Sequence, residues 1–295
     1  MATAASASRH SGGGQAGPSA RRRAVEGALH NRLVFLGLTL GLVFVFMALL
    51  PNLLTPADPY KMNVSHAMAG PTSENWLGTD NFGRDVWTRI VYGSRSSLGI
   101  AFASVSVACS LGTLLGLLAG YFGKTVDQVF GRLMDIFFSF PSLLLAIIVA
   151  GILGPSMQNV ILAITVVYTP FFFRVARGPT LVEKEREYIL AARTLGASAP
   201  RILLRHVLPN ILAPVVVQAS VTLCYAILTE ASLSYLGLGI QPPHPSWGSI
   251  LNEGRPYLQI APWISVFPGL TIMLAVLAFN LLGDGLRDLW DPRNV

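Results

Sequence analysis

Long apolar segments separated by shorter polar ones run along most of the chain. A helix needs about 20 mostly apolar residues to cross a bilayer, because the hydrocarbon core is roughly 30 Å thick. Polar residues flank the shortest of the candidate segments at both ends, which places these ends near the interfaces. The pattern therefore predicts an all-α membrane protein with six transmembrane helices, at Leu33–Leu54, Leu98–Phe122, Leu133–Leu153, Val160–Phe173, Ile211–Leu236 and Trp263–Leu282.

Composition supports a membrane protein. Of the 295 residues, 52% are hydrophobic and only 12% are charged, whereas soluble proteins carry about 25% charged residues. The net charge of +6 does not gather with aromatic residues on one amphipathic face, so nucleic acid is not indicated as a partner. Cys109 and Cys224 lie inside apolar segments, which argues against a disulfide framework or a thiolate metal site.

Basic residues predict the orientation. If the N-terminus lies inside, sixteen of the 21 Lys and Arg residues fall in inside segments. The five outside ones are Lys61, Arg84, Arg89, Arg95 and Arg255. Cytoplasmic loops carry an excess of Lys and Arg. Both termini and the loop 174–210 are therefore predicted to face the cytoplasm.

Residues 1–30 differ from the rest of the chain. Ala, Ser, Gly and Arg dominate, with Gly12–Gly14 and Arg21–Arg23, and no apolar periodicity supports a fold. We predict a disordered, basic cytoplasmic tail. A cleaved signal peptide is the rival interpretation, but the first apolar segment is too long and Thr55–Ala57 is a poor cleavage site. An uncleaved anchor is favoured.

The outside segment 55–97 is predicted to form an ordered extracytoplasmic cap, because Pro, Asn, Asp and Gly favour turns there. Arg84 and Asp85 stand close to the second span, and contact with a ligand is an open alternative for them. A second rigid outer loop, Gln241–Gly248, is set by prolines and contains Trp247.

Three features inside the spans invite functional readings. Gly112, Gly116 and Gly120 share a helix face and favour close packing, either within the bundle or against another subunit. Pro141 is expected to kink or unwind its helix, either structurally or beside a watery path. Glu230, a carboxylate near the end of a span, is a functional candidate by default. A salt bridge from Glu230 to an outer arginine is the competing interpretation.

Gly123-Lys124-Thr125 resembles the end of a phosphate-binding loop but does not qualify as one. That motif needs a glycine where Leu118 stands, and a strand rather than a membrane helix before it. The chain is therefore predicted to have no ATPase machinery of its own.

Between the fourth and fifth spans, Glu183–Thr194 is predicted to form a short amphipathic helix. Gly196 allows a turn, because glycine accepts backbone angles that other residues avoid. Arg201–Val207 is predicted as a second short helix, and Pro209 starts the return to the membrane. The two helices would form a compact knob, although an ordinary basic interfacial helix explains these residues as well on physical grounds alone.

The knob resembles the "EAA" loop of permease subunits of binding-protein-dependent ABC importers. That pattern has Ala-Ala, three residues, Gly, nine residues and Ile-x-Leu-Pro, and Ala191, Ala192 and Gly196 match it. The chain departs at Leu190 and His206, where the pattern has Glu and Ile. Both departures are frequent in the branch that imports dipeptides, oligopeptides, glutathione and nickel.

Other motifs resemble that same branch. They comprise the stretches Leu77–Asp85, Asp135–Pro141, Leu236–Gly248 and Asn280–Arg293. The resemblance spans residues 31–295, which we interpret as the permease domain, and it implies a type I, methionine-importer-like permease fold with cytoplasmic coupling helices.

The resemblance implies a transport subunit rather than an enzyme, with no cofactor and no metal, in a bacterial cytoplasmic membrane. It implies as partners a paralogous permease, two ATP-binding subunits and an extracytoplasmic solute-binding protein, and it leaves open which solute is carried. The implied ATPase-coupling residues are Ala191, Ala192, Gly196, Leu208 and Pro209. The candidates for the pathway or an outer gate are Glu230, Arg84, Asp85, Pro141 and Trp247.

Two other functional classes are alternatives for a chain with this apolar pattern. An intramembrane hydrolase would need a nucleophile–base constellation or a metal pair, and the sequence carries neither His-Glu-x-x-His nor Gly-x-Ser-x-Gly. A proton-driven carrier is possible on physical grounds alone, but the inverted repeats usual in such carriers are not recognisable here.

Overall fold

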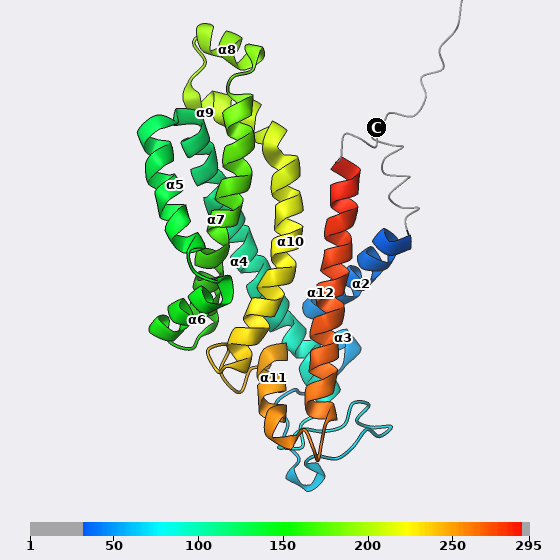
Figure 1. Ribbon diagram of the computed structural model, residues 1–295. Coiled ribbons are helices and arrows are strands. Elements are labelled where there is room, and N and C mark those ends of the chain that lie inside the picture. The colour runs from blue at the N-terminus through cyan, green and yellow to red at the C-terminus, as the bar shows by residue number, and fades with distance from the viewer. Residues whose placement is uncertain (1–31, 291–295) are drawn as a thin grey trace, which may run out of the picture.

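The computed structural model describes residues 32–290, so the predicted tail 1–30 lies outside the described residues. Within this range the chain is helical, and pairing of strand type is limited to an isolated bridge between Thr79 and Asp85. The helices are α2 (Arg32–Leu49), α3 (Pro51–Leu54), α4 (Val86–Phe122), α5 (Lys124–Phe138), α6 (Ser142–Leu153), α7 (Met157–Glu183), α8 (Glu187–Thr194), α9 (Ala199–Ile202), α10 (Leu208–Tyr235), α11 (Trp247–Gly254) and α12 (Trp263–Trp290) (Figure 1). Short 3₁₀ turns occur at Val64–His66 and Arg255–Tyr257, and a π turn at Leu203–Val207.

Four helices of the described part are long and apolar enough to cross a membrane. They are α4, α7, the continuous helix Ala199–Tyr235 that contains α10, and Trp263–Asp288 of α12. The pair α5 and α6 counts as a fifth if a bent pair is one span. The apolar part of α2, Val34–Leu49, is shorter. The fold class is as predicted, but the count of six spans is not fully confirmed.

The first predicted span divides into two helices. α2 ends at Leu49, and α3 begins at Pro51 after a break at Leu50. Proline disfavours a helical conformation in the residue before it, which accounts for the break at this point. α2 packs on α12 through glycine, since a Cβ added at Gly37 would lie 2.5 Å from the Leu281 Cβ.

The third predicted span, Leu133–Leu153, is wrong as one continuous helix. α5 and α6 meet at an angle of 92°, and Pro141 lies at the break. The predicted disruption of the helix at Pro141 is confirmed, and it is a complete break rather than a kink. Pro141 has no N–H for a helical bond, and it adopts an extended conformation with φ −57° and ψ 132°.

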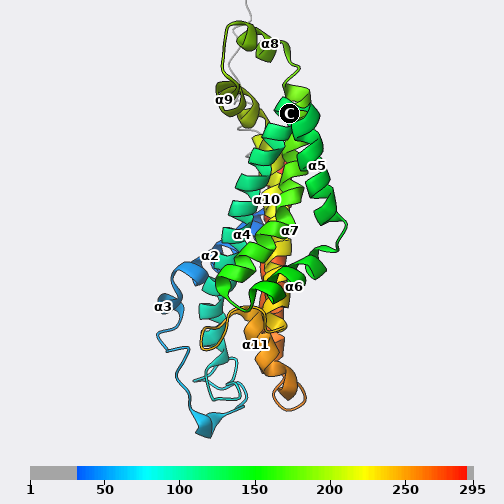
Figure 2. The same ribbon diagram turned by 90° about the vertical axis from the view of Figure 1, so that its left-hand side faces the viewer.

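α4 and α7 form the centre of the bundle and lie side by side in both views (Figures 1 and 2). A Cβ at Gly112 would lie 2.5 Å from the Thr169 carbonyl oxygen, and one at Gly116 would lie 2.5 Å from that of Phe173. Of the two alternatives for these glycines, close packing within the bundle is therefore confirmed.

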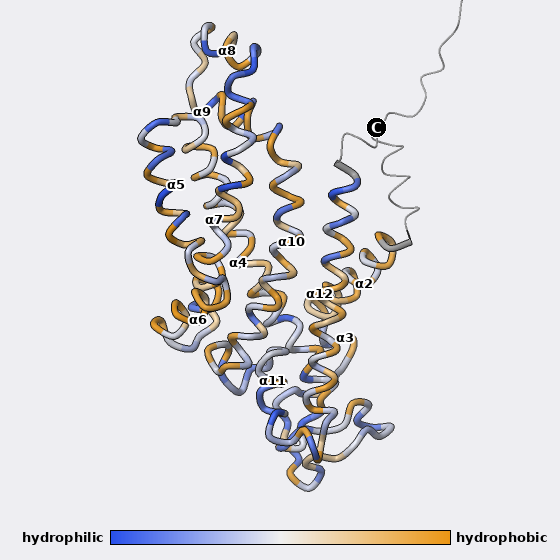
Figure 3. The backbone as a smooth tube through the Cα atoms, in the orientation of Figure 1, coloured by the Kyte–Doolittle hydropathy of each residue, from blue (hydrophilic) through white to orange (hydrophobic). Residues whose placement is uncertain are grey.

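The two ends of the bundle differ in structure. α8 and α9 lie at one end, whereas α11 and the segment 55–85 lie at the other (Figure 1). Polar residues are prominent at both of these ends along the backbone (Figure 3). The loop and the cap expected from the sequence therefore lie at opposite ends of the molecule.

Candidate functional site

α8 projects beyond the ends of the long helices (Figures 1 and 2). Ile189 is its buried residue, and Ile202 and Val207 are buried at the base of the same loop. Ala191 is exposed and Ala192 is half-buried. The side chain of Leu195, which follows the helix, is 88% exposed. The projection therefore combines an apolar base with an outer surface of small and apolar side chains.

Gly196 ends α8 through its backbone conformation. Its φ is +83°, in the left-handed region that favours glycine. The amide of Ala197 donates to the Ala192 carbonyl at 3.0 Å, and the amide of Gly196 donates to the Arg193 carbonyl at 3.0 Å. These two bonds form a Schellman motif. A Cβ at Gly196 would meet no atom within 4 Å, so the requirement is for the backbone angle and not for space.

Three polar side chains tie α8 to two long helices. The Tyr188 hydroxyl donates to the Glu183 carboxylate at the end of α7. The Asn210 amide, in the first turn of α10, donates to the Tyr188 hydroxyl at 2.8 Å and to Glu183 Oε1 at 3.1 Å. Burial and the bond to Glu183 raise the pKa of Tyr188, so the hydroxyl stays protonated and able to donate. We call these three residues the α8 tie.

The end of α4 also holds the loop. The Lys184 ammonium donates to the Gly120 carbonyl at 2.9 Å. The Arg193 guanidinium lies 5.4 Å from the centroid of the Tyr121 ring, within the range of a cation–π contact. α8 is thus attached to α4, α7 and α10.

The boundaries of the loop differ from the expectation. α7 stays helical to Glu183, so only part of 174–210 leaves the helices. α8 begins at Glu187 rather than at Glu183. The second short helix predicted at Arg201–Val207 is instead part of the continuous helix that leads into α10. Pro209 lacks the N–H that would bond one turn back, which is consistent with the π turn directly before α10.

Leu208 and Pro209 start α10. Leu208 is half-buried and Pro209 is exposed. Both lie beside Asn210 of the α8 tie, so every residue expected to couple to an ATPase belongs to α8, its end or the start of α10.

A cavity of about 380 Å³ lies between α6, α7 and α10. Its α10 wall carries hydrogen-bonding groups at helical spacing, so they share one face: Gln218, Thr222, Tyr225, Thr229 and Ser232. Tyr168 of α7 bonds to Thr229 at 2.9 Å between their hydroxyl oxygens. Leu143 and Phe171 add apolar surface. The cavity can bind a polar but uncharged group.

This wall was missed at the level of the sequence. Polar residues recur every three or four positions inside the predicted span Ile211–Leu236, and that spacing could have identified them. Pro141 stands next to Ser142, which lines the cavity. Glu230 likewise follows Thr229 of the lining, so two of the candidates for the pathway or an outer gate adjoin a lining residue in the chain.

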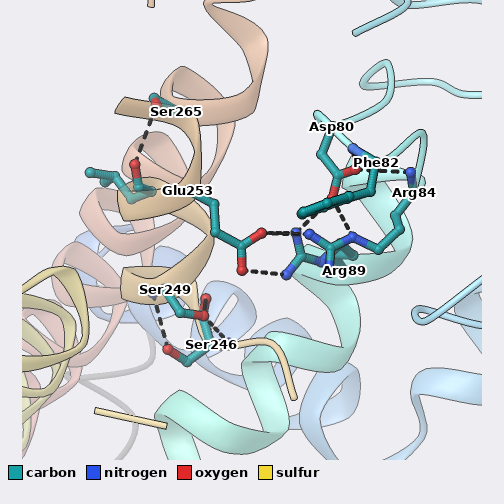
Figure 4. Close-up of polar contacts among 9 residues, drawn as sticks. Asp80, Phe82, Arg84, Arg89, Ser246, Ser249, Glu253 and Ser265 are labelled. Atoms are coloured by element: carbon teal, nitrogen blue, oxygen red, sulfur yellow. Dashed lines mark hydrogen bonds and ion pairs between the residues drawn. The ribbon is translucent and has the colours of Figure 1, made fainter. Parts of the chain in front are cut away.

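Four charged residues form a buried cluster at the opposite end, which we call the outer clasp (Figure 4). Arg84 binds Asp80 at 2.6 Å and Glu253 at 2.6 Å. Arg89 binds Asp80 at 2.7 Å and Glu253 at 2.7 Å. Both arginine side chains are almost fully buried, and the four charges balance. The clasp joins the outer segment, the start of α4 and α11.

The remaining gate candidates occupy structural positions near the clasp. Asp85 caps α4 by accepting a bond from the Thr88 amide at 2.7 Å. Trp247 is fully buried, and its indole N–H donates to the Ile90 carbonyl at 3.0 Å. Neither residue is among those that line the cavity between α6, α7 and α10.

Glu230 is fully buried and accepts a bond from the Ser234 hydroxyl at 2.7 Å. The alternative interpretation, a salt bridge from Glu230 to an outer arginine, is wrong: among the described residues Glu230 forms no ion pair. The buried arginines of the outer end, Arg84 and Arg89, bind Asp80 and Glu253 instead.

Known proteins share both the sequence and the fold. Residues 112–295 match the family described as binding-protein-dependent transport system inner membrane component. The dipeptide transport system permease protein DppC of Alkalihalophilus pseudofirmus is 46% identical over 272 residues, 92% of this chain and 90% of that protein. The glutathione transport system permease protein GsiD of Pectobacterium atrosepticum is 50% identical over 224 residues, 76% of this chain and 74% of that protein.

Among solved structures, an inward-facing MetNI methionine ABC transporter is similar over 68% of this chain and 96% of that chain. The TM-score is 0.55 and the identity 22%, so this likeness concerns the fold alone. It confirms the methionine-importer-like architecture, and the relatives' names confirm the subfamily indicated by the motifs. The chain therefore belongs to the family of binding-protein-dependent transport system inner membrane components, as a permease subunit of an ABC importer that leaves ATP hydrolysis to separate subunits.

Proposed function

We propose that this permease pairs with a paralogous permease to form the path by which short peptides enter the cytoplasm. An extracytoplasmic binding protein delivers the peptide, and two ATP-binding subunits drive the cycle. α8 and both termini face the cytoplasm, in agreement with the distribution of Lys and Arg. The names of relatives that transport dipeptides and glutathione support this class of solute.

The observation that carries the proposal is the projection of α8 as a separate, braced helix (Figure 2). Its exposed apolar end at Leu195 needs a protein partner to leave water. The small side chains of Ala191 and Ala192 allow a groove of that partner to approach the helix closely. Gly196 shapes the end of the helix, and Leu208 and Pro209 lead the chain back into the membrane.

The α8 tie supplies a route from the ATP-binding subunit to the path. When ATP closes the two ATP-binding subunits, α8 moves with the surface to which it is docked. Tyr188 passes this displacement to Glu183 of α7 and Asn210 of α10. α7 and α10 line the cavity, so their movement changes its access to either side of the membrane.

The cavity fits a peptide backbone. The hydroxyls and the amide along α10 can exchange hydrogen bonds with peptide groups without selecting a side chain. Arg84, Asp85, Trp247 and Glu230 are not among the residues that line this cavity, and we assign them to the outer region that must rearrange when the path opens outward. Pro141 shapes the break beside the cavity.

A tagged chain purified in mild detergent from its native membrane tests the proposal. Mass spectrometry should find a second permease and ATP-binding subunits. After reconstitution with the binding protein, uptake of L-alanyl-L-alanine should require ATP and survive dissipation of the proton gradient. A chain that purifies alone and transports only with a proton gradient would instead be a secondary carrier.

A further inference from the structure

An aromatic series leads from the cavity to an arginine of α7. Tyr168 and Phe171 line the cavity. The Phe171 ring packs edge-on against Phe138, with 5.0 Å between the ring centroids. The Arg174 guanidinium carbon lies 4.0 Å from the centroid of the Phe138 ring. Arg174 is therefore two ring contacts away from a wall of the cavity.

Arg174 holds its acidic neighbour loosely. The shortest distance from its guanidinium to the Asp135 carboxylate is 3.9 Å, longer than a hydrogen bond. The two side chains are 65% and 76% exposed. One turn along α7, Arg177 binds Asp127 at 2.6 Å in a two-bonded pair. Unlike Arg177, Arg174 keeps donors available for another carboxylate.

The position of Arg174 favours an aqueous mouth of the path. The helical rise places it about 26 Å from the outer end of α7, near the cytoplasmic side of the bilayer. Charged side chains within spanning helices usually face the bundle interior or a water-filled cavity. Contact with lipid hydrocarbon would leave both Arg174 and Asp135 poorly solvated, so a water-filled exit satisfies both.

We infer that Arg174 binds the carboxylate of the peptide as it leaves the cavity for the cytoplasm. Asp135 competes for the same guanidinium and shortens the residence of the peptide. The neutral cavity then holds the amide groups, while Arg174 draws the charged terminus outward. This inference rests on the proposed function, because it names a residue that discriminates among solutes on the same path.

The test is the binding of two probes to the assembled transporter, free of nucleotide and binding protein, in phosphatidylcholine nanodiscs. Saturation-transfer difference NMR measures the affinities for L-alanyl-L-alanine and for its C-terminal amide. The wild type should prefer the free acid by about fivefold, the size expected of one exposed ion pair. Arg174→Gln should lose this preference, and Asp135→Asn should increase it.

Arg132→Gln is the matched control, because it removes an exposed charge one turn from Asp135 on α5 and should leave the preference unchanged. Equal binding of the two probes by the wild type would overturn the inference. A preference lowered by both Arg174→Gln and Asp135→Asn would also overturn it, because it would indicate a structural pair. If phosphatidylglycerol in the discs abolishes the preference for the free acid, Arg174 binds a lipid phosphate instead, and the inference is overturned.

Uptake by the same preparation separates the two proposals. ATP-driven uptake of L-alanyl-L-alanine without any preference in binding would overturn the role of Arg174 and leave the importer intact. Absence of uptake when all subunits are present would overturn the proposed function and this inference with it. If Arg174→Gln does not assemble with its partners, Asp135→Asn alone tests the inference. A stronger preference for the free acid in this variant supports the role of Arg174, and an unchanged or weaker preference overturns it.

Discussion

The amide of Ala197 donates to the carbonyl of Ala192 at 3.0 Å, across a glycine whose φ is +83°. This bond explains why a glycine stands at position 196, four residues after Ala192. The alanine carbonyl accepts the bond that ends the helix, and only a residue tolerant of the left-handed region can stand between donor and acceptor. The spacing therefore defines a rigid end of α8.

Gly196→Val should abolish uptake while membrane insertion stays intact. A β-branched residue in the left-handed region costs about 1–3 kcal/mol, so the end of α8 would rearrange. Gly196→Asn is the control, because asparagine tolerates this region better and should retain much of the uptake. Uptake in reconstituted vesicles measures both variants, and full activity of the valine variant would remove the docking role of Gly196.

Tyr188→Phe should uncouple ATP hydrolysis from transport. The variant keeps the ring but loses the hydroxyl that joins Glu183 and Asn210, and each such bond contributes about 1 kcal/mol. We expect severalfold less peptide transported per ATP hydrolysed, with the ATP-binding subunits still bound. Tyr235→Phe, which removes a hydroxyl without a hydrogen bond among the described residues, should not change this ratio. If Tyr188→Phe transports as much peptide per ATP hydrolysed as the wild type, the α8 tie does not transmit the movement of α8 to α7 and α10.

Glu253→Gln should destabilise the outer end. The change leaves two buried arginines with one carboxylate, and breaking a buried ion pair costs about 3–5 kcal/mol. Thermal unfolding in detergent should show a clear fall in Tm. Glu74→Gln removes an exposed carboxylate of the outer segment, outside the clasp, and should leave Tm unchanged. Equal Tm values for both variants would mean that the clasp does not hold the cap.

Gly116→Ala should loosen the contact between α4 and α7. The new Cβ would lie 2.5 Å from the Phe173 carbonyl oxygen, so the helices must separate, at a cost of about 1–3 kcal/mol. Gly99→Ala on the same helix adds a Cβ with no atom within 4 Å and serves as the control. Thermal stability in detergent compares the two, and equal stability would contradict the close approach of these helices.

Local chemistry made much of this structure predictable. The apolar segments, the glycine face of α4, the break at Pro141 and the turn at Gly196 each follow from residues near one another in the chain. The angle between α5 and α6 did not follow, because proline predicts a break but not its direction. The break at Leu50 was missed because the apolar pattern continues through it.

Contacts between distant segments could not be predicted from the sequence. Glu253 meets Arg89 across 164 positions, and Asn210 meets Tyr188 across 22. Neither pair has a local pattern that selects the partner. For the same reason the sequence offered Arg84 only as a candidate for the pathway or an outer gate, and its ion pairs with Asp80 and Glu253 became visible in the fold.

The docking of α8 is tested most directly by photo-cross-linking in the assembled transporter. A photoreactive phenylalanine analogue at position 195, where the side chain is 88% exposed, should cross-link to an ATP-binding subunit. The same analogue at position 64, where Val64 is 74% exposed on the outer segment, should not. Cross-linking of position 195 only to lipid, or of position 64 to the ATP-binding subunit, would contradict α8 as the coupling helix.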